Sequence, residues 1–372
     1  MKITIERGLL LKVLTHIQGV VERRNTIPIL SNVKFDASDG QLSLNATDMD
    51  IDIVETIPAD VTSAGSATAP AHTLYDIVRK LPEGAQVELI CTGDDSQLTL
   101  SAGRSRFKLT CLPTEDFPVL SGGDLPNSFT LSAADLRGLI DRTRFAISTE
   151  ETRYYLNGIY LHAADNDGVQ VLRAVATDGH RLASVEIPLP DGAAGMPGVI
   201  VPRKAISEIR KLIDETEDEI AISLSDTKIK FAFEGTVLTS KLIDGTFPDY
   251  VRVIPENNEK VLEVETDVFA HAVDRVSAIS TEKSRAIKLT ITKGNLTLSA
   301  NNPDNDTATE EVPVDYDQSE IEIGFNSRYL LDIVQQIEGD RARFTLADAA
   351  SPTLVQDPDD QGAIYVLMPM RV

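Results

Sequence analysis

The sequence has only two cysteines, Cys91 and Cys111, among its 372 residues. Two cysteines cannot form the disulfide framework of a small secreted protein, so we expect free thiols and a cytoplasmic location. The chain also lacks an apolar run of about 18 residues, which excludes a transmembrane helix. The segment Met1–Arg7 contains an acid and no apolar core, so we expect no signal peptide.

The signatures of common enzyme classes are also missing. The five histidines show no zinc-ligand spacing, and there is neither a Gly-x-x-x-x-Gly-Lys loop nor a Gly-x-Ser-x-Gly elbow. The best catalytic lead is Asp48, Asp50 and Asp52, which alternate along a predicted strand and could hold Mg²⁺ for nucleotidyl transfer. An exposed strand face gives the same pattern, and the corresponding segment Asp178–Arg181 does not keep the three acids.

The sequence repeats itself at an interval of 130 residues. Two short segments recur at this interval, and a third, more diverged copy of the first one follows. The matching segments are Leu42–Asp48, Ala176–Asp178 and Leu296–Asn302, and Phe117-Pro118 with Phe247-Pro248. Repeats of this size indicate repeated structural units. We therefore predict three domains, joined by short polar links near 121–127 and 255–260, with the boundaries 1–121, 128–254 and 257–372.

Each repeat contains two segments with the apolar period of a helix, as in the stripe Leu10, Val13, Leu14 and Ile17. The predicted helices are 6–17, 71–81, 132–145, 202–213, 267–276 and 326–338. Between them, apolar and polar residues alternate as in half-buried strands, in Gln41–Asn45, Glu219–Leu224, Lys228–Phe233 and Ile287–Thr292. The fold class is therefore α+β, with two helices on an antiparallel sheet in every repeat.

Positive charge is scarce overall, with 35 Lys and Arg against 58 Asp and Glu and a net charge of −23. This balance argues against tight nucleic-acid binding, which needs clustered cations. The six predicted helices nevertheless contain 13 Lys and Arg against 9 Asp and Glu, a net +4, which leaves −27 for the remainder.

Two interpretations of this charge distribution stay open. Strands and loops can simply be acidic, as on many protein surfaces. Alternatively, a weakly basic helical face lets DNA pass without gripping it, so that the DNA is held topologically. Repeated units that associate head to tail can close such a ring, from three units alone or from six units in two chains.

Several motifs together resemble one family, the bacterial sliding clamps, which are the beta subunit of the replicative DNA polymerase III. The matching motifs, in the family's order along the whole chain, are Thr26–Asn32, Gly103–Phe107, Arg153–Gly158, Ala176–Leu182, Val201–Lys204, Thr239–Gly245, Phe247–Tyr250 and Met368–Arg371. The resemblance implies the DNA clamp fold and a head-to-tail homodimer that forms a six-domain ring around duplex DNA. It also implies no catalytic activity, no cofactor and no metal.

The resemblance further implies a pocket between the second and third domains that binds short peptides. Its partners would be the DNA polymerase catalytic subunit, the clamp loader and repair polymerases. Met and Val side chains could form an adaptable floor for a Leu or Phe anchor. The matching positions are Leu156, Thr177, Gly179, His180, Arg181, Leu182, Pro248, Arg252, Val253, Val366, Met368, Pro369, Met370 and Arg371.

Two further sets of residues follow from the resemblance. The expected DNA-facing residues are Arg24, Lys12, Arg79, Lys80, Arg137, Arg203, Lys204, Arg210 and Lys211. The expected dimer contacts are Arg104, Arg106, Phe107 and Leu109 of one chain with Ala278 and Ile279 of the other. One segment departs from the family pattern, because Thr149–Glu151 carries two acids where a neutral amide near DNA is common.

Three functions therefore remain as hypotheses. The first is a DNA-encircling clamp that tethers a polymerase. The second is a metal-dependent nucleotidyl transferase or nuclease that uses Asp48, Asp50 and Asp52. The third is a repeat-built scaffold that binds proteins but not DNA.

Overall fold

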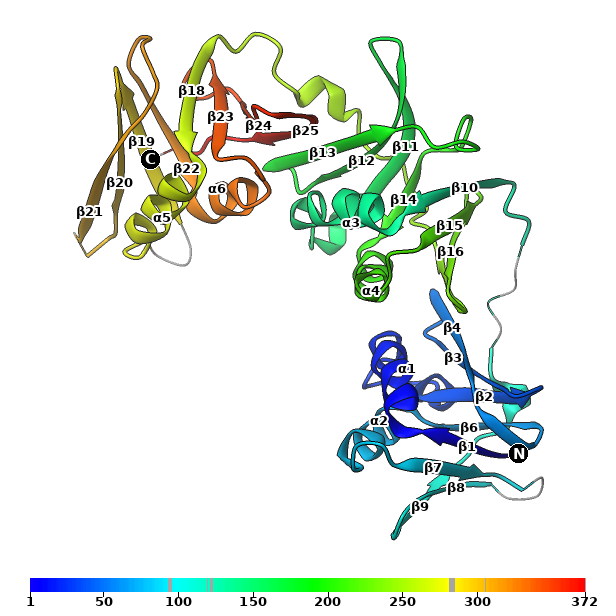
Figure 1. Cartoon of the computed structure of the whole chain (residues 1–372). Coiled ribbons are helices and arrows are strands. Elements are labelled where there is room, and N and C mark those ends of the chain that lie inside the picture. Colours follow the sequence, from blue (N-terminus) through cyan, green and yellow to red (C-terminus); the bar gives the residue numbers. More distant parts are fainter. Residues whose placement is uncertain (93–95, 119, 121–122, 281–284, 305, 372) are drawn as a thin grey trace. The chain divides into compact units, whose positions relative to one another are not determined.

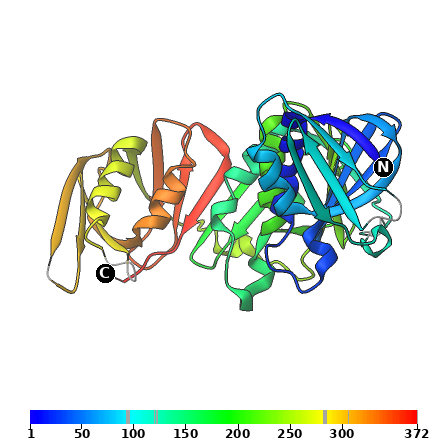
Figure 2. The same cartoon turned by 90° about the horizontal axis from the view of Figure 1, so that it is seen from below.

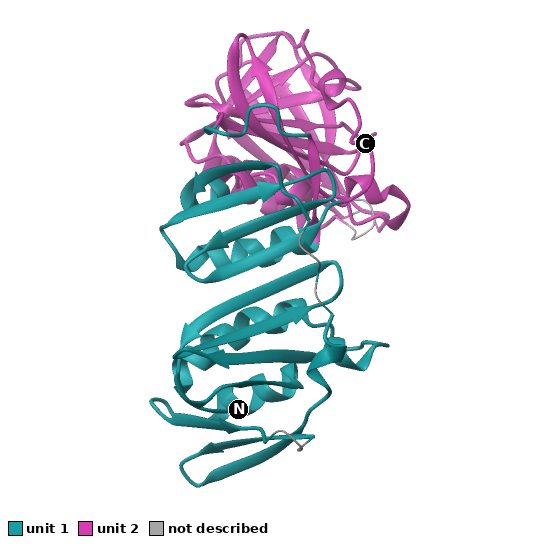
Figure 3. Ribbon diagram, turned by 90° about the vertical axis from the view of Figure 1, so that its right-hand side faces the viewer, with its two compact units in different colours: residues 1–137, 190–197, 204–242 teal, residues 138–189, 198–203, 243–372 magenta. Residues whose placement is uncertain are grey.

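The computed structural model describes all residues except 93–95, 119, 121–122, 281–284, 305 and 372. Ser121, where the first predicted domain ends, and Val372 therefore lie outside the described residues. The chain forms two compact units, which Figure 3 colours separately: unit 1 is 1–137, 190–197 and 204–242, and unit 2 is 138–189, 198–203 and 243–372. No described helix is long and apolar enough to cross a membrane.

Unit 1 contains two antiparallel sheets. Its strands are β1 (Lys2–Glu6), β2 (Asn32–Ser38), β3 (Gln41–Thr47), β4 (Ile51–Pro58), β5 (Asp60–Ser63), β6 (Gly65–Pro70), β7 (Gln86–Ile90), β8 (Gln97–Ala102), β9 (Ser105–Thr110), β10 (Asn127–Ser132), β15 (Glu219–Leu224), β16 (Lys228–Phe233) and β17 (Thr236–Lys241). One sheet has the order β5-β1-β7-β8-β9, and the other has the order β10-β15-β16-β17-β4-β3-β2-β6. Strands of the first two repeats thus share one sheet, through the pairing of β17 with β4.

The helices of unit 1 are α1 (Arg7–Val20), α2 (Ala71–Lys80) and, from its second residue on, α4 (Arg203–Leu212); the border between the units falls within α3 (Ala133–Asp141). Helices α1 and α2 lie side by side (Figure 1). α1 extends beyond the predicted Ile17 because Val20 continues its buried apolar stripe. The chain has Gly19 there, where an added Cβ would lie 2.2 Å from the Glu208 carboxylate of α4.

Unit 2 also contains two antiparallel sheets. Its strands are β11 (Gly158–Asn166), β12 (Val169–Thr177), β13 (Arg181–Pro188), β14 (Val199–Pro202), β18 (Lys260–Glu265), β19 (Ala286–Thr292), β20 (Asn295–Asn301), β21 (Thr307–Pro313), β22 (Ile321–Asn326), β23 (Arg341–Leu346), β24 (Thr353–Asp357) and β25 (Asp360–Leu367). The orders are β14-β11-β12-β13-β25-β24-β23-β18 and β21-β20-β19-β22. The second predicted domain contributes strands to both units, because its two halves join sheets of different neighbours.

The helices α5 (Thr266–Ser277) and α6 (Ser327–Val334) of unit 2 lie side by side, as Figure 2 shows in yellow and orange. All six predicted helices and all four quoted strands are present, so these predictions are confirmed. Two helices, α3 and α6, end four residues earlier than predicted, at Asp141 and Val334. The Thr143 hydroxyl donates to the Leu139 carbonyl after the end of α3, and the Gln336 amide donates to the Asp332 carbonyl after the end of α6. Side chains thus take carbonyls that continued helices would use.

The turns Thr47–Ile51 and Thr177–Arg181 have the same hydrogen bonds. In each, the threonine hydroxyl donates to the carbonyl four residues on, over 2.8 and 2.7 Å, and accepts the N–H two residues on, over 3.1 Å in both. The aspartate accepts the N–H three residues on, over 2.7 and 3.0 Å. Both turns have a positive φ at their third residue, 79° at Met49 and 87° at Gly179. The sequence repeat is therefore a repeat of local structure.

His16 of α1 lies between two carboxylates. Its Nδ1 is 2.8 Å from Glu55 Oε1 on β4, and its Nε2 is 3.4 Å from an oxygen of Glu215 in η5 (Ile213–Glu215). The side chains of His16 and Glu55 are only 9% and 6% exposed. Burial alone would lower the pKa of His16, but the hydrogen bonds and charges of Glu55 and Glu215 outweigh it and raise the pKa above 6.5.

The contribution of His16 to the stability of unit 1 should therefore decrease as the pH rises. A His with a raised pKa contributes stability that is fully present below its unfolded value and is lost as the pH passes its folded value. Replacing His16 by Ala leaves Glu55 buried without this partner. We expect this to lower the free energy of unfolding by about 3 kcal/mol at acidic pH and by less at alkaline pH. Urea unfolding between about pH 5.5 and 8.5 measures both effects. An identical pH dependence in the wild type and His16→Ala would contradict the assignment.

Candidate functional site

Three of the predicted peptide-site residues form an apolar floor on one face of the eight-stranded sheet of unit 2. Leu156 ends η4 (Glu151–Leu156), and Leu182 of β13 faces Val366 of β25 in register. All three are buried, and they pack in one cluster with Phe247 and Tyr250. Sequence reasoning included the first three and missed the two aromatic residues that pack with them.

The segment 247–254 crosses this floor and forms its rim. Phe247 stacks on Tyr160, with ring centroids 4.9 Å apart and ring planes 8° apart. After it, η6 (Tyr250–Val253) buries Tyr250 but leaves Arg252 and Val253 exposed. The rim thus offers apolar and cationic groups next to a buried apolar floor, an arrangement that suits a peptide anchor.

The C-terminal residues contact two different parts of unit 2. The Met368 N–H donates to the His180 carbonyl over 2.9 Å, and the Met368 side chain is 39% exposed. The Met370 N–H donates to the Gly324 carbonyl, also over 2.9 Å. Pro369, Met370 and Arg371 line a different hollow of about 900 Å³, which lies over the sheet of β19–β22. The structure therefore groups Met368 with His180, but places the residues after it beside this second hollow.

Arg181 is only 8% exposed and points into the unit. Its guanidinium pairs with Asp178 and with Asp332 of α6, and it lies 4.3 Å from the ring centroid of Tyr329. His180 stacks on the same tyrosine. Arg181 therefore binds α6 to the turn rather than facing solvent. Tyr329 and Asp332 were missed, because nothing in the sequence links α6 to this turn.

Gly179 has a backbone conformation that favours glycine, with a φ of 87°. Met49 adopts 79° in the matching turn, so a side chain is tolerated there at a cost in strain. An added Cβ at Gly179 would lie 2.7 Å from Nη1 of Arg153, and the flexible end of that arginine would have to move. Gly179 lies exposed beside His180, while Thr177 closes the turn beneath them. Pro248 and Arg371 are also exposed.

Of the nine predicted DNA-facing cations, six are exposed, namely Arg24, Lys12, Arg79, Lys80, Arg203 and Lys211. The other three are partly buried. Arg137 donates to the carbonyls of Ile213 and Thr216 over 2.8 and 3.1 Å, and Arg210 pairs with Asp214 at 2.9 Å. As DNA contacts all nine residues stay predictions, and the structure gives Arg137 and Arg210 partners within the protein.

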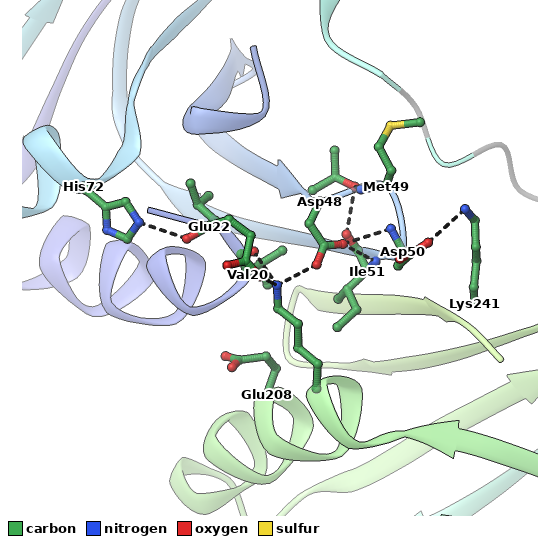
Figure 4. A network of polar contacts seen from close by, with 12 residues as sticks. Val20, Glu22, Asp48, Met49, Asp50, Ile51, His72, Glu208 and Lys241 are labelled. Atoms are coloured by element: carbon green, nitrogen blue, oxygen red, sulfur yellow. Dashed lines mark hydrogen bonds and ion pairs between the residues drawn. The ribbon is translucent and has the colours of Figure 1, made fainter. Parts of the chain in front are cut away.

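The third partly buried cation, Lys204, has three hydrogen-bond partners, Val20, Glu22 and Asp48, which Figure 4 labels. Its ammonium donates to the Val20 carbonyl at the end of α1, to Glu22 and to Asp48, over 3.1, 2.5 and 2.6 Å. Burial lowers the pKa of Lys204, but the two carboxylates raise it by more. Lys204 thus joins α4 to α1 and to the turn after β3.

Replacing Lys204 by Met should therefore reduce the free energy of unfolding more than it weakens DNA binding. Loss of the bonds to two carboxylates and a carbonyl is expected to cost about 2 kcal/mol of unfolding free energy. The matched variant Lys80→Met, at an exposed site, should stay within about 0.5 kcal/mol of the wild type. Urea unfolding compares them, and equal stability of the two variants would show that Lys204 is not a structural tie.

The three acids of the metal hypothesis do not converge. Asp48 accepts from Lys204 and from backbone N–H groups, and Asp50 pairs with Lys241 at 3.0 Å. Asp52 is largely buried, which raises its pKa to about 6 despite a hydrogen bond from Asn45. Among the described residues, no group of three or more His, Cys, Asp and Glu is placed to hold a metal ion.

The predicted dimer contacts lie on or next to the edge strand β9 and directly after α5. In the described part of the chain β9 pairs only with β8, and β21 only with β20. Arg104 and Arg106 are exposed and Phe107 is half-buried, whereas Leu109 is only 8% exposed and packs within its own unit. Ala278 is exposed and Ile279 half-buried after α5.

In the segment Thr149–Glu151, which departs from the family pattern, Glu150 pairs with Arg153 at 3.2 Å.

Comparison with known proteins identifies the family. Models of the DNA polymerase III beta subunit match the chain with their N-terminal domain over residues 1–121, their central domain over 130–249 and their C-terminal domain over 251–371. The beta sliding clamp of Caulobacter vibrioides is 56% identical over 372 residues, which are all of both chains.

Two solved structures show the same likeness. The beta sliding clamp of C. crescentus has a TM-score of 0.98 and 56% identity, over 100% of this chain and 99% of that one. The DNA polymerase III subunit beta of Bartonella birtlesii, a sliding clamp bound to griselimycin, has a TM-score of 0.97 and 51% identity over 100% of both. Family models that together match nearly the whole chain and relatives of this identity leave one conclusion. The chain belongs to the DNA polymerase III beta subunit family and is a bacterial DNA sliding clamp of the replicative polymerase.

Proposed function

We propose that two copies of this chain join head to tail in a closed ring around duplex DNA and hold the polymerase on its template. The observation that carries this proposal is a pair of sheet edges with opposite charge. The edge strand β9 exposes Arg106 and Lys108, whereas β21 exposes Glu311; its other acid, Glu310, is partly buried and pairs with Arg275. Pairing β9 of one copy with β21 of the other would cover both edges.

The direction of assembly follows from these edges. The two edges differ in charge. The basic β9 edge of one copy therefore attracts the acidic β21 edge of another copy and repels a second β9 edge. Two such contacts close a dimer. The domains 1–121, 128–254 and 257–372 would then contribute six repeated units to the ring.

The ring would hold DNA topologically rather than by strong contacts. With a net charge of −23 the chain cannot grip DNA by releasing many counterions. The exposed cations Arg24, Lys80 and Arg203 are enough for weak, sequence-independent contact. Sliding along a template requires such weak contact, needs no chemistry from this protein, and takes place in the cytoplasm.

The floor of Leu156, Leu182 and Val366 with the rim 247–254 is proposed as the site for partner peptides. An extended peptide could place Leu or Phe on the floor and keep polar residues in water. The clamp of B. birtlesii is solved with griselimycin, so we use griselimycin as the probe of this site. Partners would be the polymerase, the clamp loader and repair polymerases.

A topological retention experiment tests the ring. The protein is loaded by a clamp loader onto a nicked circular plasmid, gel-filtered at moderately high salt, and filtered again after the plasmid is cut once. We expect retention on the circle and loss from the linear DNA.

Other outcomes favour the other hypotheses. Equal retention on circular and linear DNA would mean ordinary contact binding and would overturn the ring. A protein that binds griselimycin but is retained on neither DNA would fit a scaffold. Cleavage or extension of the nicked plasmid with Mg²⁺, lost in Asp48→Ala, would instead indicate a nucleotidyl transferase or nuclease.

A further inference from the structure

Three polar residues form a row across the sheet that carries the proposed peptide site. His162 of β11 faces Arg173 of β12, and Arg173 faces Glu186 of β13. The Arg173 guanidinium donates to Glu186 Oε2 from Nε and Nη2, over 2.9 and 2.7 Å. Both side chains are less than a fifth exposed. This row plays no part in the contacts described above for the floor or the rim.

The row holds the hydroxyl of Tyr250. Arg173 Nη1 donates to it over 3.1 Å, and His162 Nε2 lies 3.0 Å from it. His162 Nδ1 donates to the Ala163 carbonyl over 3.0 Å, and burial together with the charge of Arg173 lowers the pKa of His162. The ring is therefore neutral with its proton on Nδ1, so Nε2 accepts the hydrogen bond of the Tyr250 hydroxyl.

Tyr250 is the first residue of η6, the short helix that forms part of the rim of the peptide site. Its ring packs in the same cluster as Leu156, Leu182 and Val366. The chain then leads directly to the exposed Arg252 and Val253. Fixing the Tyr250 hydroxyl therefore fixes where the rim lies relative to the floor.

The first repeat provides an internal comparison. Its strands pair in the same way, but Asp36, Ser43 and Thr56 stand where the second repeat has His162, Arg173 and Glu186. Ser43 and Thr56 share a hydrogen bond of 3.0 Å, and Asp36 accepts from Ser66. Leu120 follows Phe117 at the distance at which Tyr250 follows Phe247, and a leucine has no hydroxyl to hold. The fold of a repeat thus forms without this row.

We propose that His162, Arg173 and Glu186 are positioning residues for the peptide site, and that they act by holding Tyr250 and with it the rim segment 250–253. The proposal rests on the proposed function of that site. A rim already held in place spares the peptide the cost of ordering it, so the row increases affinity without touching the peptide.

Titration calorimetry with griselimycin tests the proposal. Tyr250→Phe keeps the ring but loses the hydroxyl, and we expect it to bind about tenfold more weakly, the effect of one net hydrogen bond. Arg173→Met should weaken binding by a similar factor. The double variant should be no weaker than either single variant, because both changes break the same link.

Rescue separates positioning from general damage. His162→Ala should lose affinity like Tyr250→Phe, whereas His162→Gln should keep most of it, because the amide oxygen can accept from the hydroxyl. Thr56→Ala changes the matched row of the first repeat and should bind within about twofold of the wild type. Thermal unfolding should show similar midpoints for Tyr250→Phe and Thr56→Ala.

Two results would overturn the inference while leaving the proposed peptide site in place. Binding by Tyr250→Phe within about twofold of the wild type, with the wild type binding normally, would show that the hydroxyl does not position the rim. Equal losses in His162→Gln and His162→Ala would show that the histidine acts by packing alone. A wild type that does not bind griselimycin would instead reject the proposed peptide site, and the inference with it.

Discussion

Reversing the charge of the β9 edge is expected to raise the dissociation constant of the dimer by more than about 100-fold. In the proposed pairing of β9 with β21, Arg106→Glu with Lys108→Glu would place acids opposite the Glu311 edge of the partner. Like charges at an interface cost several kcal/mol, and about 1.4 kcal/mol corresponds to a factor of ten in affinity. The effect is large because a head-to-tail dimer contains this contact twice. Sedimentation across a dilution series measures it.

A second reversal on the other edge should restore the dimer. Adding Glu311→Lys to the β9 variant gives each copy swapped edges, which again attract each other. Lys293→Glu, in the exposed turn between β19 and β20, serves as the matched control and should dimerise like the wild type. If the β9 variant stays dimeric, or if the compensating change restores nothing, this edge is not the dimer contact.

Periodic features of the fold could be predicted from the sequence, because they depend on neighbours close along the chain. The α1 stripe from Leu10 to Ile17 repeats every three or four residues, and the strand Glu219–Leu224 alternates strictly. The repeated Thr-Asp turn could be found for the same reason, since its hydrogen bonds span at most four residues. The helix ends after Asp141 and Val334 were misplaced, because side chains there replace backbone donors.

The roles of individual charges could not be predicted in this way. Lys204 has the sequence environment of an exposed helical cation, yet its partners Val20 and Asp48 are more than 150 residues away along the chain. Arg181 lies in a motif that the resemblance assigns to the peptide site, but its partner Asp332 is on α6. Such pairs become visible only when the fold brings distant strands and helices together.

The two aromatic residues that pack with the floor of the peptide site show a related limit of prediction from sequence. The sequence shows Phe247 in a repeat and Tyr250 in a family motif, but it assigns neither residue to the peptide site. Their roles depend on Tyr160 and Arg173, which lie on β11 and β12. The first repeat has the same Phe-Pro pair, but Phe117 packs with Ile29 and Leu30 in a different apolar cluster. The sequence repeat alone would suggest two equal sites.

Deleting Met368–Val372 is expected to abolish binding of griselimycin, with a loss of at least about 100-fold. The deletion removes the Met368 side chain and the hydrogen bond that places it beside His180. Truncation of a central anchor commonly costs about 2–4 kcal/mol, which corresponds to factors of roughly 30 to 1,000. Binding is measured by calorimetry on the wild type and the deletion side by side.

Single substitutions locate the effect within the tail. Met368→Ala should account for most of the loss, whereas Met370→Ala should have little effect, because Met370 lines the separate hollow over β19–β22. The dimer should survive the deletion, since neither β9 nor β21 includes the tail. Loss of both the dimer and the binding would mean that the tail is structural, and unchanged binding would remove it from the site. Binding that survives in Met368→Ala but fails in Met370→Ala would place the peptide in the hollow over β19–β22 instead.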